Sequence, residues 1–500
     1  MKLLRYKVSK NAQKAGPIDI PDHGRPVTRR EFVSRGLISG LAMVCFPLAN
    51  GLLVPRANAQ NTGCDTGTPS LQGKIPFLAF DLSGGASIAG SNVLVGGPGG
   101  QEDFLSAEGY EKLGLPSDML PNLPGQINNE LGLVFHADSA LLRGILSKTS
   151  ATTRANVDGT VFCARSENDT EKNPLNPMYG ISRAGATGDL VALIGTRSSD
   201  SGGRSIAPES MIDPSVRPTK VARPREAMGL VDTGKLVALL NNTDAAAVMR
   251  TIERLSAARI ARLGESDTLK ALLNCAYRQA ADTVARFGDP DALNPLTDPL
   301  LQSIFSADEL DSSTFSKTAT VAKLVLNQFA GAGTIQLSGY DYHDGSRGTG
   351  EVKDFRAGQA IGGVLEYAAQ LNRPVMIYVF SDGSVASNGQ IDDSPDGRGK
   401  GIWKSDNAST AAAFMLVYHP SGRPRLRRPE ANQIGYFRPS GSNETGATPI
   451  SNNVTQLTEA IVLNYLALHD EVGRFGELFP NHGLGDAASI DQLIAFEPVG

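Results

Sequence analysis

Apolar runs with few polar interruptions predict the strands of this chain. A strand that is apolar at nearly every position has both faces buried, which is typical of a parallel sheet covered on two sides. The runs are IPFLAFDLSGG (75–85), LGLVFH (131–136), GTVFCARS (159–166), DLVALIG (189–195), GTIQLSGYDYH (333–343), RPVMIYVFSD (373–382) and AAAFMLVYHP (411–420).

Helical periodicity lies between and after these runs. Residues 234–288 place Val248, Ile252 and Leu255 at i, i+4 and i+7, with charged side chains between them. Further helices are predicted at 307–330, 355–371 and 457–468. Strand, helix and strand in this order predict right-handed parallel crossovers, and therefore an α/β sandwich.

One long segment breaks this pattern. Residues 384–410 are rich in Gly, Ser, Asp and Asn and carry no clear periodicity. We therefore predict a long loop there, of the kind that is functional or disordered in a compact domain.

The first 59 residues have the order of an export signal. The pair Arg29-Arg30 precedes a charge-free run at 36–55, and Ala57-Asn58-Ala59 follows it. This predicts a twin-arginine signal peptide, read by the twin-arginine (Tat) translocase and cleaved after Ala59, and a periplasmic or secreted product. The alternative is an uncleaved N-terminal anchor, but the glycines, Pro47 and Asn50 make the run a poor permanent span.

The remainder divides into a polar linker at 60–73 and a single domain at 74–500, with a helical insertion around 234–330. Removal of residues 1–59 takes away ten basic and three acidic side chains. The net formal charge therefore changes from −5 to −12, with 37 basic against 49 acidic residues. Such a chain repels nucleic acid, and the longest basic cluster is only RLRR at 425–428.

Three cysteines remain after the predicted cleavage, namely Cys64, Cys163 and Cys275. No two have the CxxC spacing of a thiolate metal site. One disulfide could form in an oxidising compartment, and the sequence does not choose its pair.

Acidic residues gather at the predicted strand ends, where ligands bind in an open α/β sheet. Asp81 and Asp382 each follow an apolar run, and Asp406 precedes the run that begins at 411. Asp341 and His343 are two apart, so in an extended segment their side chains share one face and could hold one divalent cation. The alternative for each is a solvated loop tip.

Ser166 is the candidate nucleophile, because it follows a predicted strand and is flanked by Arg165 and Glu167. The alternative is a turn serine. The sequence has no GxSxG elbow, P-loop, GxGxxG or HExxH motif. Cys163 also lacks the CxPxR pattern of sulfatases. Of the scattered histidines, only His482, in the loop FPNHG, is a further candidate.

These motifs together resemble an exported family, domain of unknown function 1501. The twin-arginine leader, FDLSGG, YDYH, VFSDG and LFPNHG occur in that family's order and span nearly the whole chain after the leader. The family looks like a distant branch of the alkaline phosphatase and sulfatase superfamily. The resemblance implies a three-layer sandwich with a mostly parallel central sheet, and acids and histidines at strand ends that bind divalent metals. It matches Asp81 to the early Asp of the family's Gly-rich turn, and Asp341 and His343 to its Asp-x-His motif. Asp382 stands at the family's Ser-Glu-Phe-Gly-Arg, and Ser166 falls near its Ser-His-Phe segment.

Three departures from the family pattern bear on the site. The family's Thr-Asp-His-Gly motif is Ser-Asp-Asn-Ala here, so Asn407 replaces a histidine after Asp406. Glu167 replaces the histidine after Ser166, and Asp382 stands where the family has glutamate. An asparagine oxygen suits Mg²⁺ or Ca²⁺ better than a histidine-rich Zn²⁺ site, although any of the three is compatible with the remaining ligands.

Two functions follow as hypotheses. The first is a metal-dependent hydrolase of phosphate or sulfate esters, with the cation held by Asp81, Asp341, His343, Asp382 and Asp406, and Ser166 as nucleophile. The second is a catalytically degenerate binding or envelope-assembly protein on the same scaffold, with residues 384–410 as its recognition surface. A metal-free serine hydrolase is a weaker third, since it lacks an elbow. The sequence names no envelope partner.

Overall fold

A computed structural model describes residues 74–167, 173–231, 250–251, 254–258, 260–262 and 290–499. The predicted signal peptide, the linker at 60–73, Cys64 and Cys275 lie outside these residues. So does most of the helical pattern predicted for 234–288. Cys163 is a buried free thiol, and the choice of a disulfide pair stays open.

Within the described residues, eight strands form one mixed sheet in the order β12-β4-β11-β8-β1-β7-β5-β6. Seven run in one direction, and only β11 is antiparallel to its neighbours. The strands are β1 (Phe77–Ser83), β4 (Val157–Phe162), β5 (Val191–Gly195), β6 (Thr219–Lys220), β7 (Ala330–Ser338), β8 (Val375–Phe380), β11 (Ala413–Tyr418) and β12 (Gln433–Ile434).

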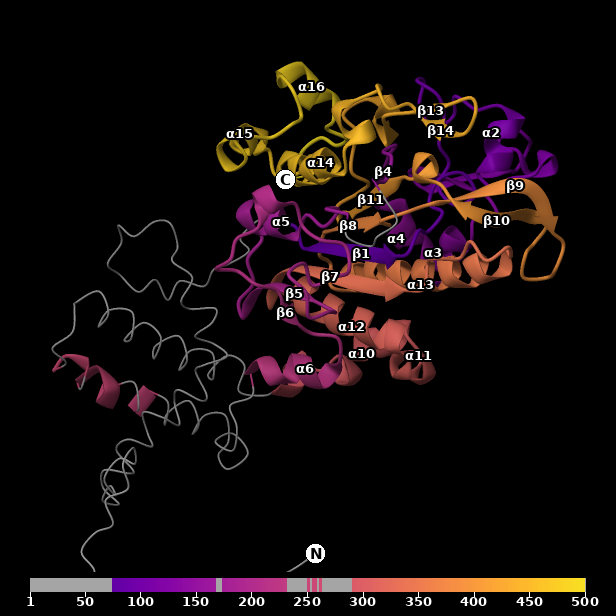
Figure 1. Cartoon of the computed structure of the whole chain (residues 1–500). Coiled ribbons are helices and arrows are strands. Elements are labelled where there is room, and N and C mark those ends of the chain that lie inside the picture. Colours follow the sequence, from indigo (N-terminus) through magenta and orange to yellow (C-terminus); the bar gives the residue numbers. More distant parts are fainter. Residues whose placement is uncertain are drawn as a thin grey trace, which may run out of the picture. The chain divides into compact units, whose positions relative to one another are not determined.

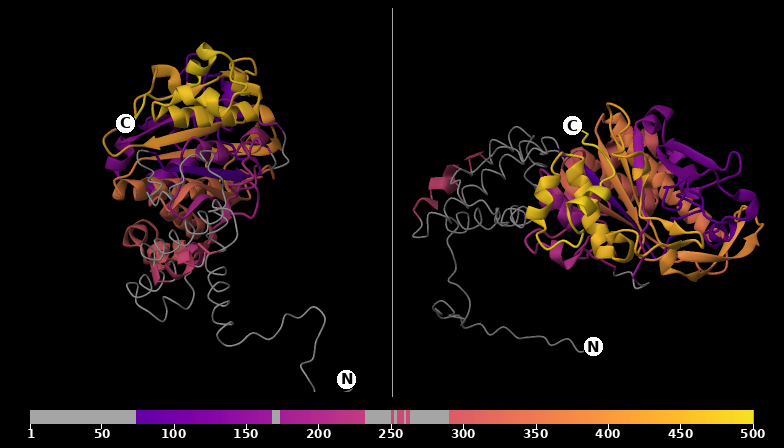
Figure 2. Two further views of the ribbon diagram at one scale, coloured as in Figure 1. Left: turned by 90° about the vertical axis from the view of Figure 1, so that its left-hand side faces the viewer. Right: turned by 90° about the horizontal axis from the view of Figure 1, so that it is seen from above.

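Helices cover both faces of this sheet (Figure 1). Alternate residues of β1 divide between two cores. Leu78 and Phe80 pack with α12 (Ser313–Leu326) and α13 (Gly348–Gln370). Phe77 and Ala79 pack with α5 (Met178–Arg183) and α14 (Val454–Ala467). Figure 2 shows the same layers, with the C-terminal helices on the face of the sheet opposite α12. The α/β sandwich with a mostly parallel sheet is confirmed.

A further helix, α3 (Ala140–Lys148), packs directly on α13 through glycines. A Cβ on Gly358 would lie 2.0 Å from the carbonyl oxygen of Leu141, and one on Gly144 would lie 2.1 Å from that of Phe355. The two backbones therefore touch, and neither position has room for a side chain. The shorter helices are α2 (Ala107–Lys112), α4 (Ala151–Ala155), α6 (Pro224–Met228), α10 (Pro299–Ile304), α11 (Ala307–Asp311), α15 (Phe475–Leu478) and α16 (Ala487–Gln492).

Three predicted segments differ from the structure. Residues 131–136 do not join the central sheet, because β3 (Leu133–His136) pairs with β2 (Ile127–Leu131) in a hairpin with Gly132 at φ +77°. Residues 384–410 form no long loop, but a second hairpin of β9 (Val385–Asp392) and β10 (Lys400–Asp406). Because this hairpin replaces a crossover helix, β11 enters the sheet antiparallel and not parallel.

Other predicted elements are present with shifted ends. The helix predicted at 307–330 divides into α11 and α12 at Ser312, whose side chain caps α12. The strand predicted at 333–343 ends at Ser338, and the helix after it begins at Gly348. The smallest hairpin joins β13 (Phe437–Arg438) to β14 (Ser442–Asn443). No helix among the described residues combines the length and the apolar character that a membrane span needs.

Candidate metal centre

The sequence-predicted acids come from neighbouring strand ends at one edge of the sheet. β1 lies between β7 and β8 in parallel register, so their carboxyl ends meet there. Asp341 follows β7, and Asp382 follows β8. Asp406 ends β10 just before β11, and the start of β11 lies at this same edge because that strand runs the other way.

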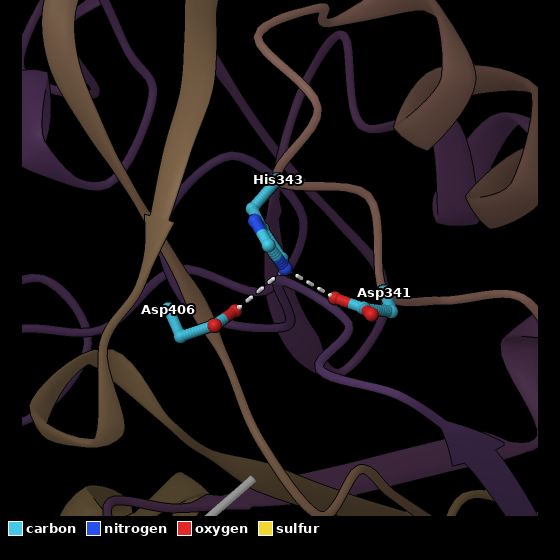
Figure 3. Close-up of side chains that lie close together, drawn as sticks. All are labelled: Asp341, His343 and Asp406. Atoms are coloured by element: carbon cyan, nitrogen blue, oxygen red, sulfur yellow. Dashed lines mark ion pairs between the residues drawn. The ribbon is translucent and has the colours of Figure 1, made fainter.

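Asp341, His343 and Asp406 form a compact cluster (Figure 3). The Nε2 atom of His343 lies 2.7 Å from Oδ1 of Asp341 and 3.5 Å from Oδ1 of Asp406. One ligand atom from each residue lies within 4.8 Å of the others. The side chains are 55%, 38% and 40% exposed in the order Asp341, His343 and Asp406, so the cluster is open to solvent.

The segment after β7 explains why Asp341 and His343 share one side. Tyr340 and Tyr342 are buried, whereas the residues that alternate with them point outward. The Tyr342 hydroxyl accepts from the Ser87 amide at 2.7 Å and donates to Asp354 at 3.0 Å. Two buried tyrosines thus hold the extended backbone so that the acid and the imidazole meet in solvent.

Gly84 fits the first strand against this segment. Its amide donates to Oδ1 of Asp382 at 2.9 Å, and a Cβ there would lie 2.4 Å from the amide nitrogen of Asp341. The φ of Gly84 is +134°, a conformation that side chains disfavour. The FDLSGG turn therefore packs one glycine against both Asp382 and Asp341.

Asp382 is fully buried, and its Oδ2 atom has no hydrogen-bond partner among the described residues. Burial raises the pKa of this carboxyl and Asp341 raises it further, while the Gly84 amide and Arg204 oppose them. A buried carboxylate oxygen without a partner is costly unless a proton or a cation satisfies it. Asp382 is thus a third acid at this edge that a cation could satisfy, although it does not belong to the group of three ligands within 4.8 Å.

Asp81 occupies a different environment inside the sheet. Its Oδ2 accepts from the amides of Arg204 and Ser205 at 2.7 and 3.0 Å, and its Oδ1 accepts from the Ser83 hydroxyl at 3.0 Å. Burial raises its pKa to about 6 against these hydrogen bonds. Oδ2 therefore holds the loop at 201–205, Oδ1 is engaged by Ser83 of the same strand, and Asp81 is not part of the three-residue cluster.

Ser166 lies beside the chain segment that follows Asp406. It is 4% exposed, and its amide donates to the carbonyl oxygen of Ala408 at 3.1 Å. The structure thus brings the end of the loop after β4 next to the start of β11. The Ser166 hydroxyl is not one of the three clustered groups.

Asn407, which replaces the family's histidine, acts as a helix cap. Its side-chain oxygen accepts from the amide and hydroxyl of Ser409 at 3.1 and 2.7 Å. That oxygen is the atom that would have bound a cation. The protein ligands brought together in the cluster are therefore two carboxylates and one imidazole.

The other histidines with a described environment have structural contacts. His136 is buried, which lowers its pKa to about 4, and His469 accepts from the Ile75 amide at 2.9 Å. The amides of Ser421 and Leu484 donate to His419 and His482. Among the described residues, only His343 belongs to a group of three or more metal-ligating side chains.

Sequence reasoning missed two lysine side chains that lie beside the segment carrying Asp341 and His343. Lys353 Nζ lies 3.4 Å from the carbonyl oxygen of Ser338. A Cβ added to Gly345 would lie 3.6 Å from Lys404 Nζ. Lys404 lies at an irregularity of the β9–β10 pairing, between Trp403 and Ser405, which no local sequence pattern indicates. Arg204, which affects Asp382, comes from a loop without any recognisable motif.

The donor set of the cluster fits a divalent cation. Carboxylate and imidazole ligands to Zn²⁺ lie about 2.0–2.2 Å from the ion, so two ligand atoms of one site are roughly 3 Å apart. The separations of 2.7 and 3.5 Å are close to this value. Solvent exposure leaves room for water or substrate beside the protein ligands, which a catalytic metal site requires and a closed structural one does not.

Comparison with known proteins adds little to this picture. No family model and no curated protein matches the chain, so the resemblance to the 1501 family is limited to its short motifs. Similar solved structures include alkaline phosphatase from the Antarctic bacterium TAB5, and a mutant of TAB5 alkaline phosphatase with Mg bound in its M3 site. Each is 12% identical, with 73% of this chain and 95% of that chain covered and a TM-score of 0.22. A TM-score this low carries no argument about activity.

Proposed function

We propose that this protein is a divalent-cation-dependent hydrolase of phosphate or sulfate esters. The observation that carries the proposal is the meeting of Asp341, His343 and Asp406 at the carboxyl edge of the sheet, within 4.8 Å and open to solvent. Such an edge is where α/β proteins bind ligands, and such a donor set is what divalent cations require. The sequence resemblance to an esterase superfamily supports the same class of reaction.

Each residue has a distinct place in the proposal. Asp341, His343 and Asp406 hold the cation, and the buried Oδ2 of Asp382, which has no hydrogen-bond partner among the described residues, is proposed as a further ligand. A bound cation polarises an ester oxygen and lowers the pKa of a bound hydroxyl. Ser166 is the proposed nucleophile. Asp81 is proposed to hold the loop at 201–205, because both of its oxygens already accept hydrogen bonds.

The test is hydrolysis of p-nitrophenyl phosphate and p-nitrophenyl sulfate, with Mg²⁺, Mn²⁺, Zn²⁺ or Ca²⁺ added. We expect one ester to be turned over with one of these ions, and the activity to be lost in Asp341→Ala and Ser166→Ala. Asp393→Ala is the matched control, because Asp393 is an exposed acid on the hairpin loop outside the cluster. Turnover that survives Asp341→Ala, or a folded wild-type protein without turnover on either ester, contradicts the proposal.

A second function is favoured by one observation, the engagement of Asn407 as a cap and not as a ligand. On this alternative the scaffold binds an envelope partner without catalysis, and the β9–β10 hairpin is its recognition surface. The two functions differ in ester turnover, which the alternative lacks, and in the effect of substitutions in the hairpin. Alanine substitution of the exposed hairpin residues Asn388 and Gln390 abolishes partner capture on the alternative, and leaves ester turnover unchanged on the first proposal.

Export belongs to the same proposal. The leader at 1–59 directs the chain to the twin-arginine translocase, and the product is periplasmic or secreted without a permanent membrane span. A net formal charge of −12 after cleavage supports a soluble product that does not bind nucleic acid.

A further inference from the structure

The hairpin that carries Asp406 is joined directly to the loop that carries His343. The Gly345 amide donates to the carbonyl oxygen of Trp403 at 3.0 Å, and the Trp403 amide donates to that of Ser346 at 3.3 Å. The β9–β10 hairpin forms its own two-stranded sheet, outside the eight-stranded one. The separation of Asp406 from His343 therefore depends on how this hairpin is docked.

Lys400, at the start of β10, is the best-buried cation in the docking contact. Its side chain is 0% exposed, and Nζ lies 2.9 Å from Oε1 of Glu351 on α13. The same Nζ donates to the carbonyl oxygen of Asp138 at 2.6 Å and lies 3.2 Å from Oδ2 of that residue. One ammonium group thus joins the hairpin to both α13 and the turn before α3.

Arg347 completes this arrangement from the loop side. Its Nε and one terminal nitrogen donate to the same Glu351 oxygen at 3.0 and 2.9 Å. Its guanidinium lies over the Trp403 ring at 4.4 Å, which allows a cation–π contact. We call Lys400, Glu351, Arg347 and Asp138 the anchor cluster.

Burial of the Lys400 ammonium makes the anchor cluster important for the docked position of the hairpin. A buried ammonium is stable only when carboxylates and carbonyls replace its water, and the loss of one partner leaves a costly unpaired charge. Glu351 and Asp138 supply those groups only while the hairpin is docked. The docked position of β10 is therefore strongly favoured over a displaced one, and Asp406 lies at the other end of the same strand.

We propose that Lys400 is a positioning residue for the cation site, although it touches none of the proposed ligands. Its insertion between Glu351 and Asp138 holds β10 against the loop at 343–346, and so places Asp406 opposite His343. The claim that this position serves a cation site rests on the proposed function, whereas the claim that Lys400 holds the hairpin in place does not.

The experiment compares Lys400→Met with Lys323→Met. Lys323 is a matched control, because it is also buried and its Nζ lies 2.7 Å from Asp298. It lies near the end of α12, which leads to the start of β7, and is thus at the edge of the sheet opposite the site. The measurements are hydrogen exchange at the Gly345 and Trp403 amides without metal, and calorimetric titration with Mn²⁺.

We expect Lys400→Met to lose at least about tenfold of the protection at both amides, and to bind Mn²⁺ about 10- to 100-fold more weakly. Lys323→Met should leave the Mn²⁺ affinity unchanged. It should lower protection at these two amides by no more than its overall loss of stability accounts for. Unchanged protection in Lys400→Met overturns the inference, as does an equal loss in Lys323→Met.

Two further results remain informative. If Lys400→Met does not fold, Glu351→Gln, which keeps the shape and removes the charge, is measured in the same way with the same expected direction. If the wild-type protein binds no Mn²⁺, this result counts against the proposed function for that ion. The amide exchange still decides whether Lys400 positions the hairpin.

Discussion

Asp81, inside β1, and Asp382, just after β8, are both buried acids, yet the hydrogen bonding of their carboxylates differs. Asp81 has hydrogen bonds on both oxygens, whereas Oδ2 of Asp382 has none among the described residues. A carboxylate whose acceptors are filled by backbone amides stabilises a loop. One with an unfilled acceptor next to another acid is suited to a cation. The two residues are thus expected to respond differently to substitution.

The raised pKa of Asp81 makes a prediction about pH and stability. Its pKa is 3.8 ordinarily and about 6 in the folded protein, so the folded state retains a proton that the unfolded state has lost between these values. The contribution of Asp81 to the free energy of unfolding therefore falls as pH rises from about 4 to 6, by about 3 kcal/mol in all. Asp81→Asn removes this titration and keeps one side-chain oxygen that can accept from the two backbone amides.

Urea unfolding of the wild type and Asp81→Asn at pH 4, 5, 6 and 7 measures this effect. The difference in unfolding free energy between the two should shift in favour of the variant as pH rises. A constant difference across this range would contradict the assigned environment of Asp81. Undiminished Mn²⁺ affinity in the variant would further support its role as a loop anchor.

Three of the five acids and histidines predicted as cation ligands gather in one cluster, and the sequence did not show how the others are used. The two-residue spacing of Asp341 and His343 predicted a shared side, and the side chains do meet. Asp406 was a looser candidate, because its position depends on an antiparallel strand that the local pattern did not reveal. The cap formed by Asn407 and the full engagement of Asp81 depend on residues distant in sequence or on turn geometry.

At the level of elements, the contact between α3 and α13 is unusually close. These helices touch through Gly144 and Gly358, with no room for a Cβ at either. Because α13 begins at the anchor cluster and also covers the sheet, its position influences both the core and the site. A side chain at this contact must separate the two helices.

We therefore predict that Gly358→Ala lowers the free energy of unfolding by about 1–3 kcal/mol, although alanine favours a helix more than glycine does. Gly476→Ala in α15 is the control, since a Cβ there meets nothing within 4 Å. Thermal unfolding followed by circular dichroism compares the two. Equal midpoints for both variants would show that the helices are not in backbone contact.

Continuous apolar runs predicted six of the eight central strands, because strands buried on both faces need little information from elsewhere. The β9–β10 hairpin was missed for the opposite reason. Its Gly, Ser and Asp residues resemble a loop, and its pairing is interrupted by two register shifts. Its stability comes from buried Lys400 and Trp403, whose partners lie on α13 and before α3. Such partners are invisible in a local window of sequence.

For the whole molecule, the predicted leader determines the compartment in which we expect the protein to act. We predict that replacement of Arg29 and Arg30 by lysine keeps the protein in the cytoplasm, because the translocase reads the arginine pair and not positive charge alone. Cell fractionation with an antibody against the chain measures this. Normal export of the Arg29→Lys, Arg30→Lys variant would contradict a twin-arginine route.

The most direct test of the central claim is the cation content of the chain purified without chelator. Elemental mass spectrometry is applied to the wild type, to an Asp341→Ala, His343→Ala double variant, and to Asp393→Ala as control. A cation site predicts near one equivalent of one divalent ion in the wild type and the control, and its loss in the double variant. The absence of bound ion from the folded wild type, with no uptake on addition of Mg²⁺, Mn²⁺, Ca²⁺ or Zn²⁺, would contradict it.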